Sequence, residues 1–154
     1  MVTRVQGRGA ADVIAELSSL LYREGRLADQ AAFLRAVMQR ETICPTSMAP
    51  GWALPHGRVK GITELSFAVA RSSYPLIWFG EGSIRPHMVF LFAVPEAEAK
   101  MYLNLVAGVA KLSQKPTLLE QLHSAPDGDS MFRILEQIPL RETRQPGVAA
   151  ARIG

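Results

Sequence analysis

The residues best suited to chemistry in this sequence are its histidines, and one of the three has an unusual setting. His56 lies between Pro55 and Gly57 and is followed by Arg58. Proline fixes the backbone angle before the histidine, and glycine leaves room for another molecule to approach. An imidazole presented in this way is nearly neutral at pH 7 and nucleophilic, and Arg58 is a ready partner for an anion. The alternative interpretation is a loop histidine without a function.

The other candidate side chains give weaker indications. His87 begins an apolar run and is expected to face water or a backbone carbonyl, while His123 is expected near a helix end, where the dipole favours its partial charge. No two histidines have the spacing of a helical metal site, and the single cysteine, Cys44, excludes a four-thiolate zinc site. A pair of Cys44 and His56 is conceivable, but a small passive residue is the simpler interpretation. We therefore expect no metal and no cofactor.

The apolar pattern predicts the elements that must position these residues. Helices are expected at 11–24, 29–41, 96–113, 116–123 and 127–138, and strands at 52–54, 65–70, 76–79 and 87–94. Asp29 and either Asp127 or Asp129 are expected to cap helices, and Glu96 and Glu98 fall in the first turn of another. The run at 87–94 is apolar enough for a strand buried on both faces. This order predicts an α/β fold in which helices cover both faces of a sheet.

Length and charge narrow the class of protein. The chain has 154 residues, of which 48% are hydrophobic and 20% charged, so we expect one folded domain with a real core. The net charge of +3 does not indicate nucleic-acid binding, because residues 1–9 and 141–154 each carry +2 and leave 12 basic and 13 acidic residues between them. The sequence has no glycine-rich phosphate loop and no Gly-x-Ser-x-Gly motif, so a nucleotide enzyme or a serine hydrolase is not supported.

The same features predict how the chain is organised. No apolar run approaches the roughly 20 residues that span a bilayer, and the N-terminal arginines are not followed by the apolar core of a secretory signal. We expect a cytoplasmic protein without membrane insertion. It would consist of an N-terminal arm at 1–9, a domain at 10–140 and a disordered basic tail at 141–154.

The stretch from 40 to 58 joins several short motifs into one longer pattern. It reads Arg40-Glu41, Pro45-Thr46, Gly51 and then Ala53-Leu54-Pro55-His56-Gly57-Arg58. This pattern resembles the active-site segment of the enzyme IIA components of the bacterial phosphoenolpyruvate-dependent phosphotransferase system. The match is to the fructose/mannitol-type branch, which includes the nitrogen-related regulators. The strand at 89–95, the helix after it and the segment 118–135 fit the same family, so the resemblance covers roughly residues 10–140.

The resemblance implies a fold, a reaction and partners. The fold is a mixed β-sheet sandwiched between helices, like that of phosphotransferase/anion-transport proteins. A histidine phosphocarrier protein delivers a phosphoryl group to the enzyme IIA histidine, which passes it to an enzyme IIB component in sugar uptake. His56 matches the phosphorylated histidine, and its ε nitrogen is expected to attack. Arg40 matches an arginine near the phosphohistidine, Thr46 matches a threonine that could orient the ring, and Arg58 is a plausible added donor.

One position departs from the family pattern. Sugar-type members commonly carry a second histidine near the first, and the matching residue here is Tyr102. A tyrosine can donate a hydrogen bond to a phosphoryl oxygen but brings no positive charge, and it could equally be a core aromatic. Two hypotheses therefore stand: a phosphocarrier in sugar uptake, or a regulatory module that controls a transporter or regulator through its phosphorylation state. A relay also needs an apolar docking surface around the histidine, for which the candidates are Trp52, Met48 and Trp78 or Phe79.

Overall fold

The computed structural model describes residues 2–4, 7–80, 82 and 84–137. Its helices are α1 (Ala10–Arg23), α2 (Gln30–Ile43), α3 (Ala99–Leu112), α4 (Pro116–Ser124) and α5 (Gly128–Leu135). Its strands are β1 (Val2–Arg4), β2 (Ser47–Met48), β3 (Trp52–Ala53), β4 (His56–Gly57), β5 (Ser66–Arg71) and β6 (Met88–Ala93).

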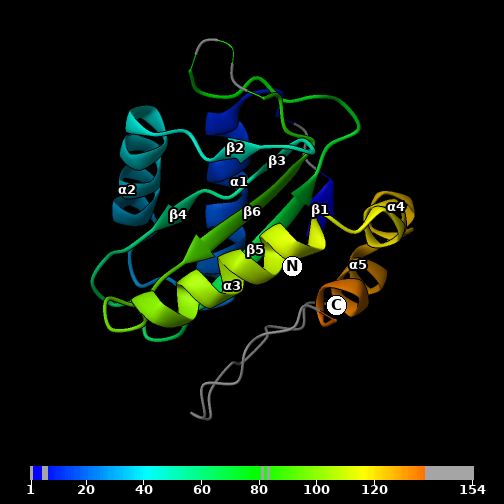
Figure 1. Ribbon diagram of the computed structural model, residues 1–154. Coiled ribbons are helices and arrows are strands. Elements are labelled where there is room, and N and C mark those ends of the chain that lie inside the picture. Colours follow the sequence, from blue (N-terminus) through cyan, green and yellow to red (C-terminus); the bar gives the residue numbers. More distant parts are fainter. Residues whose placement is uncertain (1, 5–6, 81, 83, 138–154) are drawn as a thin grey trace.

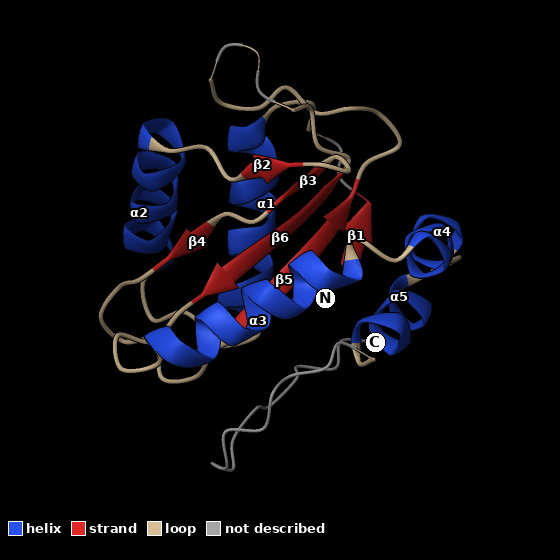
Figure 2. Cartoon of the chain, viewed as in Figure 1, coloured by secondary structure: helices blue, strands red, loops and turns tan. Residues whose placement is uncertain are grey.

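The strands form one mixed sheet between two layers of helices (Figures 1 and 2). Its order is β1-β5-β6-β3-β2, and β4 also pairs with β6. The long antiparallel pair of β5 and β6 forms the centre, while β1 runs parallel to β5 and both β3 and β4 run parallel to β6. Helices α1 and α2 pack on one face, and α3, α4 and α5 pack on the other. The predicted α/β fold with a sandwiched mixed sheet is confirmed.

Strand β6 explains why the core has two halves. All six of its residues are buried. Val89, Leu91 and Ala93 pack with α1 and α2, whereas the alternate residues pack with α3, α4 and α5. Both faces of the strand must therefore be apolar, which is why the sequence shows a continuous run here instead of alternation.

Asp29 and Asp127 cap helices as predicted. A side-chain oxygen of Asp29 accepts from the N–H of Ala32 at 2.9 Å, and one of Asp127 accepts from the N–H of Ser130 at 2.8 Å. Residues 2–4 of the expected N-terminal arm form β1. The expected end of the last helix at 138 and the tail at 141–154 lie outside the described residues. Within the part that the structure describes, no helix is both long enough and apolar enough to cross a membrane.

Two predicted elements differ in the structure. The segment 76–79 has the burial alternation of a strand, since Leu76 and Trp78 are buried and Ile77 is exposed. Its backbone forms an isolated parallel bridge with Gly9, in which Ile77 exchanges hydrogen bonds with Arg8 and Ala10, and no strand is formed there, so the strand prediction was wrong. Helix α3 begins at Ala99, and its first turn therefore contains no acidic residue. The residues before it form a turn after Pro95.

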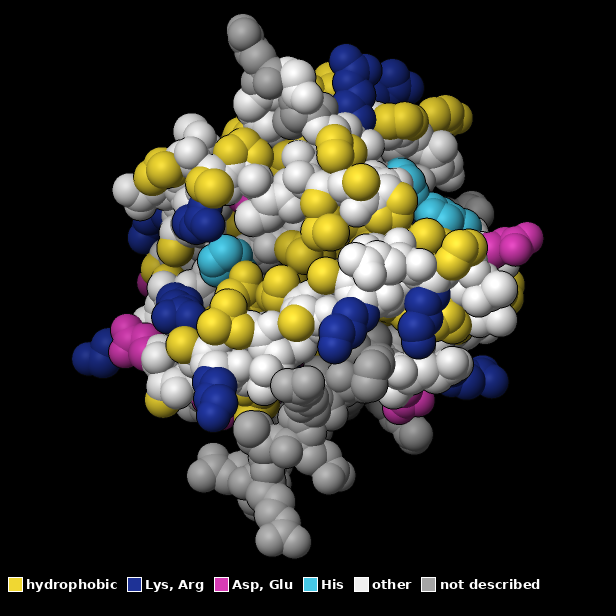
Figure 3. Space-filling model, viewed as in Figure 1, with side chains coloured by type: hydrophobic (Ala, Val, Ile, Leu, Met, Phe, Trp, Pro, Cys, Tyr) yellow, Lys and Arg dark blue, Asp and Glu magenta, His cyan; other side chains and the backbone are white. Residues whose placement is uncertain are grey.

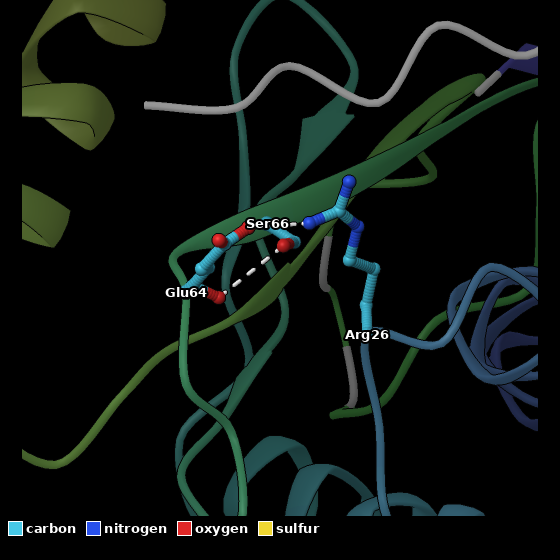
Figure 4. Close-up of polar contacts among 3 residues, drawn as sticks. All are labelled: Arg26, Glu64 and Ser66. Carbon is cyan, nitrogen blue, oxygen red and sulfur yellow. Dashed lines mark hydrogen bonds and ion pairs between the residues drawn. The ribbon is translucent and has the colours of Figure 1, made fainter. Parts of the chain in front are cut away.

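A polar contact ties the α1–α2 connection to the sheet (Figure 4). Arg26 lies in that connection and donates to the carboxylate of Glu64, just before β5, while the hydroxyl of Ser66 donates to the Glu64 carbonyl. The two charged side chains are 23% and 44% exposed. Partly exposed ion pairs contribute about 0–1 kcal/mol, so this contact helps to place the start of α2 but adds little to stability.

Candidate active site around His56

His56 is held in a two-residue strand at the edge of β6. It pairs with Phe92, and the next residue, Gly57, pairs with Ala93. Two backbone hydrogen bonds bracket it, because the N–H of Phe92 donates to Pro55 at 3.0 Å and the N–H of Val94 donates to Gly57 at 3.0 Å. His56 is therefore a strand residue and not the loop histidine of the alternative interpretation. The chain continues along β6 as β4 after the break at Pro55, which has no N–H to donate.

Gly57 makes room for helix α2 and not for a docking molecule. A Cβ at this position would lie 2.7 Å from Cε2 of Phe33 and 2.7 Å from Cγ2 of Val37. Both of these α2 side chains are fully buried, and so is Gly57 itself. Successive residues of a strand point to opposite faces. The close packing of Gly57 against α2 therefore directs His56 to the other face, toward α3.

Tyr102 of α3 packs directly against the imidazole. The ring centroids of His56 and Tyr102 are 4.9 Å apart, with planes inclined by 37°. Tyr102 also meets Phe92 edge-on at 5.7 Å and is 8% exposed. Burial raises the pKa of its hydroxyl to about 12, so the group stays neutral. Tyr102 is thus both a neighbour of His56 and a member of the core, so both interpretations of this residue that the sequence left open apply.

The surroundings of His56 favour a neutral imidazole with one free nitrogen. Burial is the main cause that lowers its pKa, and the Leu54 carbonyl acts in the opposite direction. Nδ1 is buried and has no hydrogen-bond partner among the described residues. Nε2 accepts no hydrogen bond from the described residues and, unlike Nδ1, is not enclosed. A proton on Nδ1 therefore leaves the Nε2 lone pair available for attack.

Two arginines flank this nucleophile. Arg40 stands in the last turn of α2 and Arg58 follows β4, and the positive charge of each lowers the pKa of His56. Nη1 of Arg40 also donates to the Cys44 carbonyl at 2.8 Å and so closes the end of the helix. A guanidinium has five donors, so this bond leaves others for an anion. An oxyanion bound at Nε2 would thus meet two positive charges.

Thr46 holds the backbone that leads to His56. Its Oγ1 accepts from the N–H of Leu54 at 3.1 Å, two residues before the histidine. Its own N–H donates to Oε2 of Glu41 at 3.0 Å. The structure therefore places the Thr46 hydroxyl on the chain and not on the imidazole ring.

Glu41 anchors this arrangement and was not among the predicted site residues. It is fully buried, and Oε2 also accepts from Nε1 of Trp78 at 2.9 Å. A signal for it was present in the sequence, because position 41 continues the four-residue spacing of Phe33 and Val37 on the inner face of α2. An acid on a buried helical face needs partners, and here it finds them in the segment before β4 and in the loop before β6.

The face of the molecule shown in Figure 3 presents hydrophobic side chains interspersed with Lys and Arg side chains. A surface of this kind could take part in docking.

The side chains predicted for docking do not supply this surface. Trp52 and Trp78 are buried, so that prediction was wrong for both, while Met48 and Phe79 are half-buried. The elements beside His56 expose other residues: Ile43 at the end of α2 is 75% exposed and Leu103 of α3 is 63% exposed. The tryptophans were misassigned because each is large enough to be needed in the core of a small domain.

Burial lowers the pKa of all three histidines, and this predicts sensitivity to acid. Unfolded histidines titrate near pH 6.5, so the unfolded chain binds protons first as the pH falls. The free energy of unfolding should therefore be fully present above about pH 6.5 and fall below it. His56→Gln removes one contributor, so its melting temperature should fall less than that of the wild type between about pH 7 and pH 5. Equal falls in the two proteins would contradict the lowered pKa of His56.

Comparison with known proteins identifies relatives along most of the chain. A family model for the phosphoenolpyruvate-dependent sugar phosphotransferase system, EIIA 2, matches residues 2–138. The 2-O-alpha-mannosyl-D-glycerate-specific EIIABC component of Escherichia coli is 30% identical over 127 residues, which are 81% of this chain and 19% of that protein. The nitrogen regulatory protein of Pseudomonas aeruginosa is 23% identical over 137 residues, which are 89% of each chain. The chain spans about a fifth of the length of the first two curated relatives, at 19% and 21%.

Solved structures show the same fold. The nitrogen regulatory protein IIA-Ntr from Neisseria meningitidis aligns with a TM-score of 0.78 at 23% identity, over 87% of this chain and 91% of that one. The enzyme IIA chain in a complex of IIAMtl with phosphorylated IIBMtl from Escherichia coli aligns with a TM-score of 0.73 at 14% identity, over 88% and 93% of the two chains.

Proposed function

The chain belongs to the EIIA 2 family of the phosphoenolpyruvate-dependent sugar phosphotransferase system, and from this premise we propose that it is a phosphohistidine carrier that works through Nε2 of His56. Domains of this family are phosphotransferase components. The observation that carries the proposal is the setting of the imidazole, with Nδ1 buried, Nε2 free and the charges of Arg40 and Arg58 acting on it.

The proposed reaction exchanges one nitrogen–phosphorus bond for another. Nε2 of His56 attacks the phosphorus of a phosphohistidine on the donor, and the donor's nitrogen–phosphorus bond breaks. The donor nitrogen recovers its electron pair, and each imidazole keeps the proton on its other nitrogen. His56 becomes a phosphoimidazolium that keeps the proton on Nδ1. The protein's contribution is then positioning, together with the stabilisation of phosphoryl charge by Arg40 and Arg58.

The proposed partners follow from the family. A histidine phosphocarrier protein would be the donor, and an enzyme IIB component would be the acceptor in sugar uptake, with both steps in the cytoplasm. The multidomain EIIABC relatives and the solved IIA–IIB complex support this acceptor. Ile43 lies three residues after Arg40 in α2, and Leu103 directly follows Tyr102 in α3. The exposed apolar side chains of both would contribute to docking.

A second candidate function is regulation of a partner protein. Nitrogen regulatory proteins match this chain over most of its length, for example over 89% of it in Pseudomonas aeruginosa. The expected position of Tyr102 at the family's second histidine would also suit a regulatory member. In this role the protein would still be phosphorylated at His56. The added charge of about −1.5 to −2 would change the surface that the partner reads.

Phosphorylation by purified components tests the proposal. With phosphoenolpyruvate, enzyme I and the phosphocarrier, the intact mass should rise by about 80 Da, the mass of one phosphoryl group, in an acid-labile form. The gain should map to the peptide that contains His56 and disappear in His56→Ala. His87→Gln and His123→Gln are matched controls and should keep it. A mass gain that persists in His56→Ala would exclude this site. If the gain is lost in that variant, a purified IIB domain added to the phosphorylated wild type tests whether the phosphoryl group is transferred.

Tyr102→His should accelerate phosphoryl transfer. The centroid distance of 4.9 Å would place a second, potentially cationic imidazole beside His56, and a charge-assisted hydrogen bond is about twice as strong as a neutral one. We expect transfer to and from His56 to quicken about tenfold, which corresponds to about 1.4 kcal/mol of barrier. Tyr102→Phe is the matched control for the hydroxyl and should slow transfer only if that group donates to the phosphoryl oxygens. An unchanged rate with a lower melting temperature in Tyr102→His would leave Tyr102 as a core residue only.

A further inference from the structure

A second pair of side chains meets away from His56. His87 directly precedes β6, and His123 stands in the last turn of α4. Their Nε2 atoms are 3.0 Å apart, and His87 is half-buried while His123 is exposed. We propose that His87 and His123 form a two-histidine chelate for a divalent transition-metal ion, with water completing the coordination. The site is separate from the proposed phosphoryl chemistry and does not depend on it.

The distance between the two nitrogens fits neighbouring ligands of one ion. Two nitrogens about 2.1 Å from an ion and about 90° apart, as in a tetragonal or octahedral site, would lie about 3.0 Å from each other, with ring centroids about 4.6 Å apart. The observed nitrogen distance is 3.0 Å, and the centroids are 4.5 Å apart with planes inclined by 37°. The same distance is that of a hydrogen bond between the rings, which a bound ion would replace. The tetrahedral angle of Zn²⁺ corresponds to centroids about 5.3 Å apart, so the rings would part by less than about 1 Å.

Both ligands are held in place by the fold. The backbone of His87 is fixed by its N–H, which donates to Gly51 at 2.8 Å. Its ring lies over the same glycine, where a Cβ would come within 2.6 Å of Nδ1, and the φ of +104° also favours glycine there. Nη1 of Arg71 donates to the carbonyls of Leu122 at 2.9 Å and His123 at 3.0 Å. The chelate therefore needs little rearrangement to form.

The charges at the pair set the class of metal. Histidine binds metals through its neutral imidazole, which is its main form near pH 7. Within the described residues, no group of three His, Cys, Asp or Glu side chains gathers to hold a metal, so no carboxylate completes a hard-ion site. Imidazole suits Zn²⁺, Ni²⁺ and Cu²⁺, and Mg²⁺ requires oxygen ligands. Arg71 is the charged group that acts on His123, and its positive charge limits the affinity.

The proposed ion would join two parts of the fold that are 36 residues apart in the sequence. One ligand belongs to the start of the central strand and the other to the end of α4, so a bound ion would fix α4 to the sheet. Binding to the folded chain alone raises its stability by mass action. The proposal therefore predicts a stability readout that needs no phosphoryl transfer.

Melting curves and calorimetry of the full chain with Zn²⁺ test the proposal. After treatment with a chelator, the wild type should bind one Zn²⁺ per chain, and its melting temperature should rise by about 5 °C or more at a hundredfold excess over the dissociation constant. Ni²⁺ should act similarly, and Mg²⁺ should have no effect. His123→Gln, at an exposed position, and His87→Gln should each lose the shift, while His56→Gln is the matched control and should keep it.

Three results would overturn the proposal. The first is a Zn²⁺-induced shift that survives in both His87→Gln and His123→Gln, and the second is its loss in His56→Gln. The third is a stoichiometry of one ion per two chains, which would mean that histidines from two copies bind it. If His87→Gln does not fold, His123→Gln decides the question, because its side chain is exposed and its removal leaves no buried gap.

Discussion

Glu41→Ala is expected to lower the free energy of unfolding by about 2–6 kcal/mol, because each buried donor left without an acceptor costs about 1–3 kcal/mol. The carboxylate is fully buried and accepts hydrogen bonds from the backbone N–H of Thr46 and from Nε1 of Trp78. Alanine would leave both donors without an acceptor and would open a cavity between α2 and the segment before β4. Phosphorylation of His56 should slow as well, because Thr46 would no longer be fixed against Leu54.

Denaturant unfolding and phosphorylation rates check this expectation with two controls. Glu41→Gln keeps a side-chain oxygen of the same reach and should lose much less stability than Glu41→Ala. Glu64→Ala removes an acid whose only described ion pair is partly exposed, and it should cost no more than about 1 kcal/mol. A Glu41→Ala protein as stable as Glu64→Ala would show that the buried network does not anchor the site. If the Trp78 contact is real, the double variant Glu41→Ala/Trp78→Phe should lose less stability than the sum of the two single variants.

Gly57→Val is expected to be the second most damaging substitution, and Gly57→Ala a milder form of it. The first added carbon would stand 2.7 Å from both Phe33 and Val37, which are fully buried and cannot turn away. Overpacking of this kind costs about 1–3 kcal/mol for alanine, and valine adds two more carbons in the same space. The strain would separate α2 from β4, and with them Arg40 from His56.

The prediction is checked by unfolding curves of Gly57→Ala, Gly57→Val and the double variant Gly57→Ala/Val37→Ala. Because Val37→Ala removes one of the two clashing side chains, the double variant should lose less than the sum of the two single variants. Gly9→Ala is a matched control, since its added carbon meets only Oδ2 of Asp12 at 3.7 Å. It should cost less than about 1 kcal/mol, as expected at a helix N-cap. Additive losses at positions 57 and 37 would contradict the packing argument.

Features that depend on neighbours in the sequence were predicted well. The apolar run of β6, the caps at Asp29 and Asp127 and the motif around His56 are local signals, and they led to the fold and to the family. Strand β4 was not predicted, because two residues carry no period and their pairing partner lies 36 residues later. The segment 76–79 shows the opposite case, with a strand-like pattern that forms an isolated bridge instead of a strand.

The residues of the site divide in the same way, into those found from a local motif and those that depend on contacts between distant elements. The placement of His56 beside Tyr102 was anticipated through the family motif and not through spacing, since α3 is brought to β4 only by the fold. The pair of His87 and His123 depends on a contact between distant elements, for which a single sequence carries no direct signal. For Glu41, the helical spacing indicated its burial but not its partners. The role of Gly57 was misread for the same reason, because the side chains that it accommodates belong to another helix.

The hydrogen bonds on either side of His56 also bear on the entropy of association. Ordering the backbone of one residue costs about 1–2 kcal/mol, and a nucleophile in a mobile loop would incur that cost at each encounter with a partner. Here the bonds from Phe92 to Pro55 and from Val94 to Gly57 have already fixed the chain during folding. In the proposed relay, donor and acceptor would therefore meet the same preorganised imidazole, and the free energy of docking would go into the contact itself. Slow amide exchange at Phe92 and Val94 in the free protein, unchanged on docking, is the expected signature; protection that arises only on docking would contradict it.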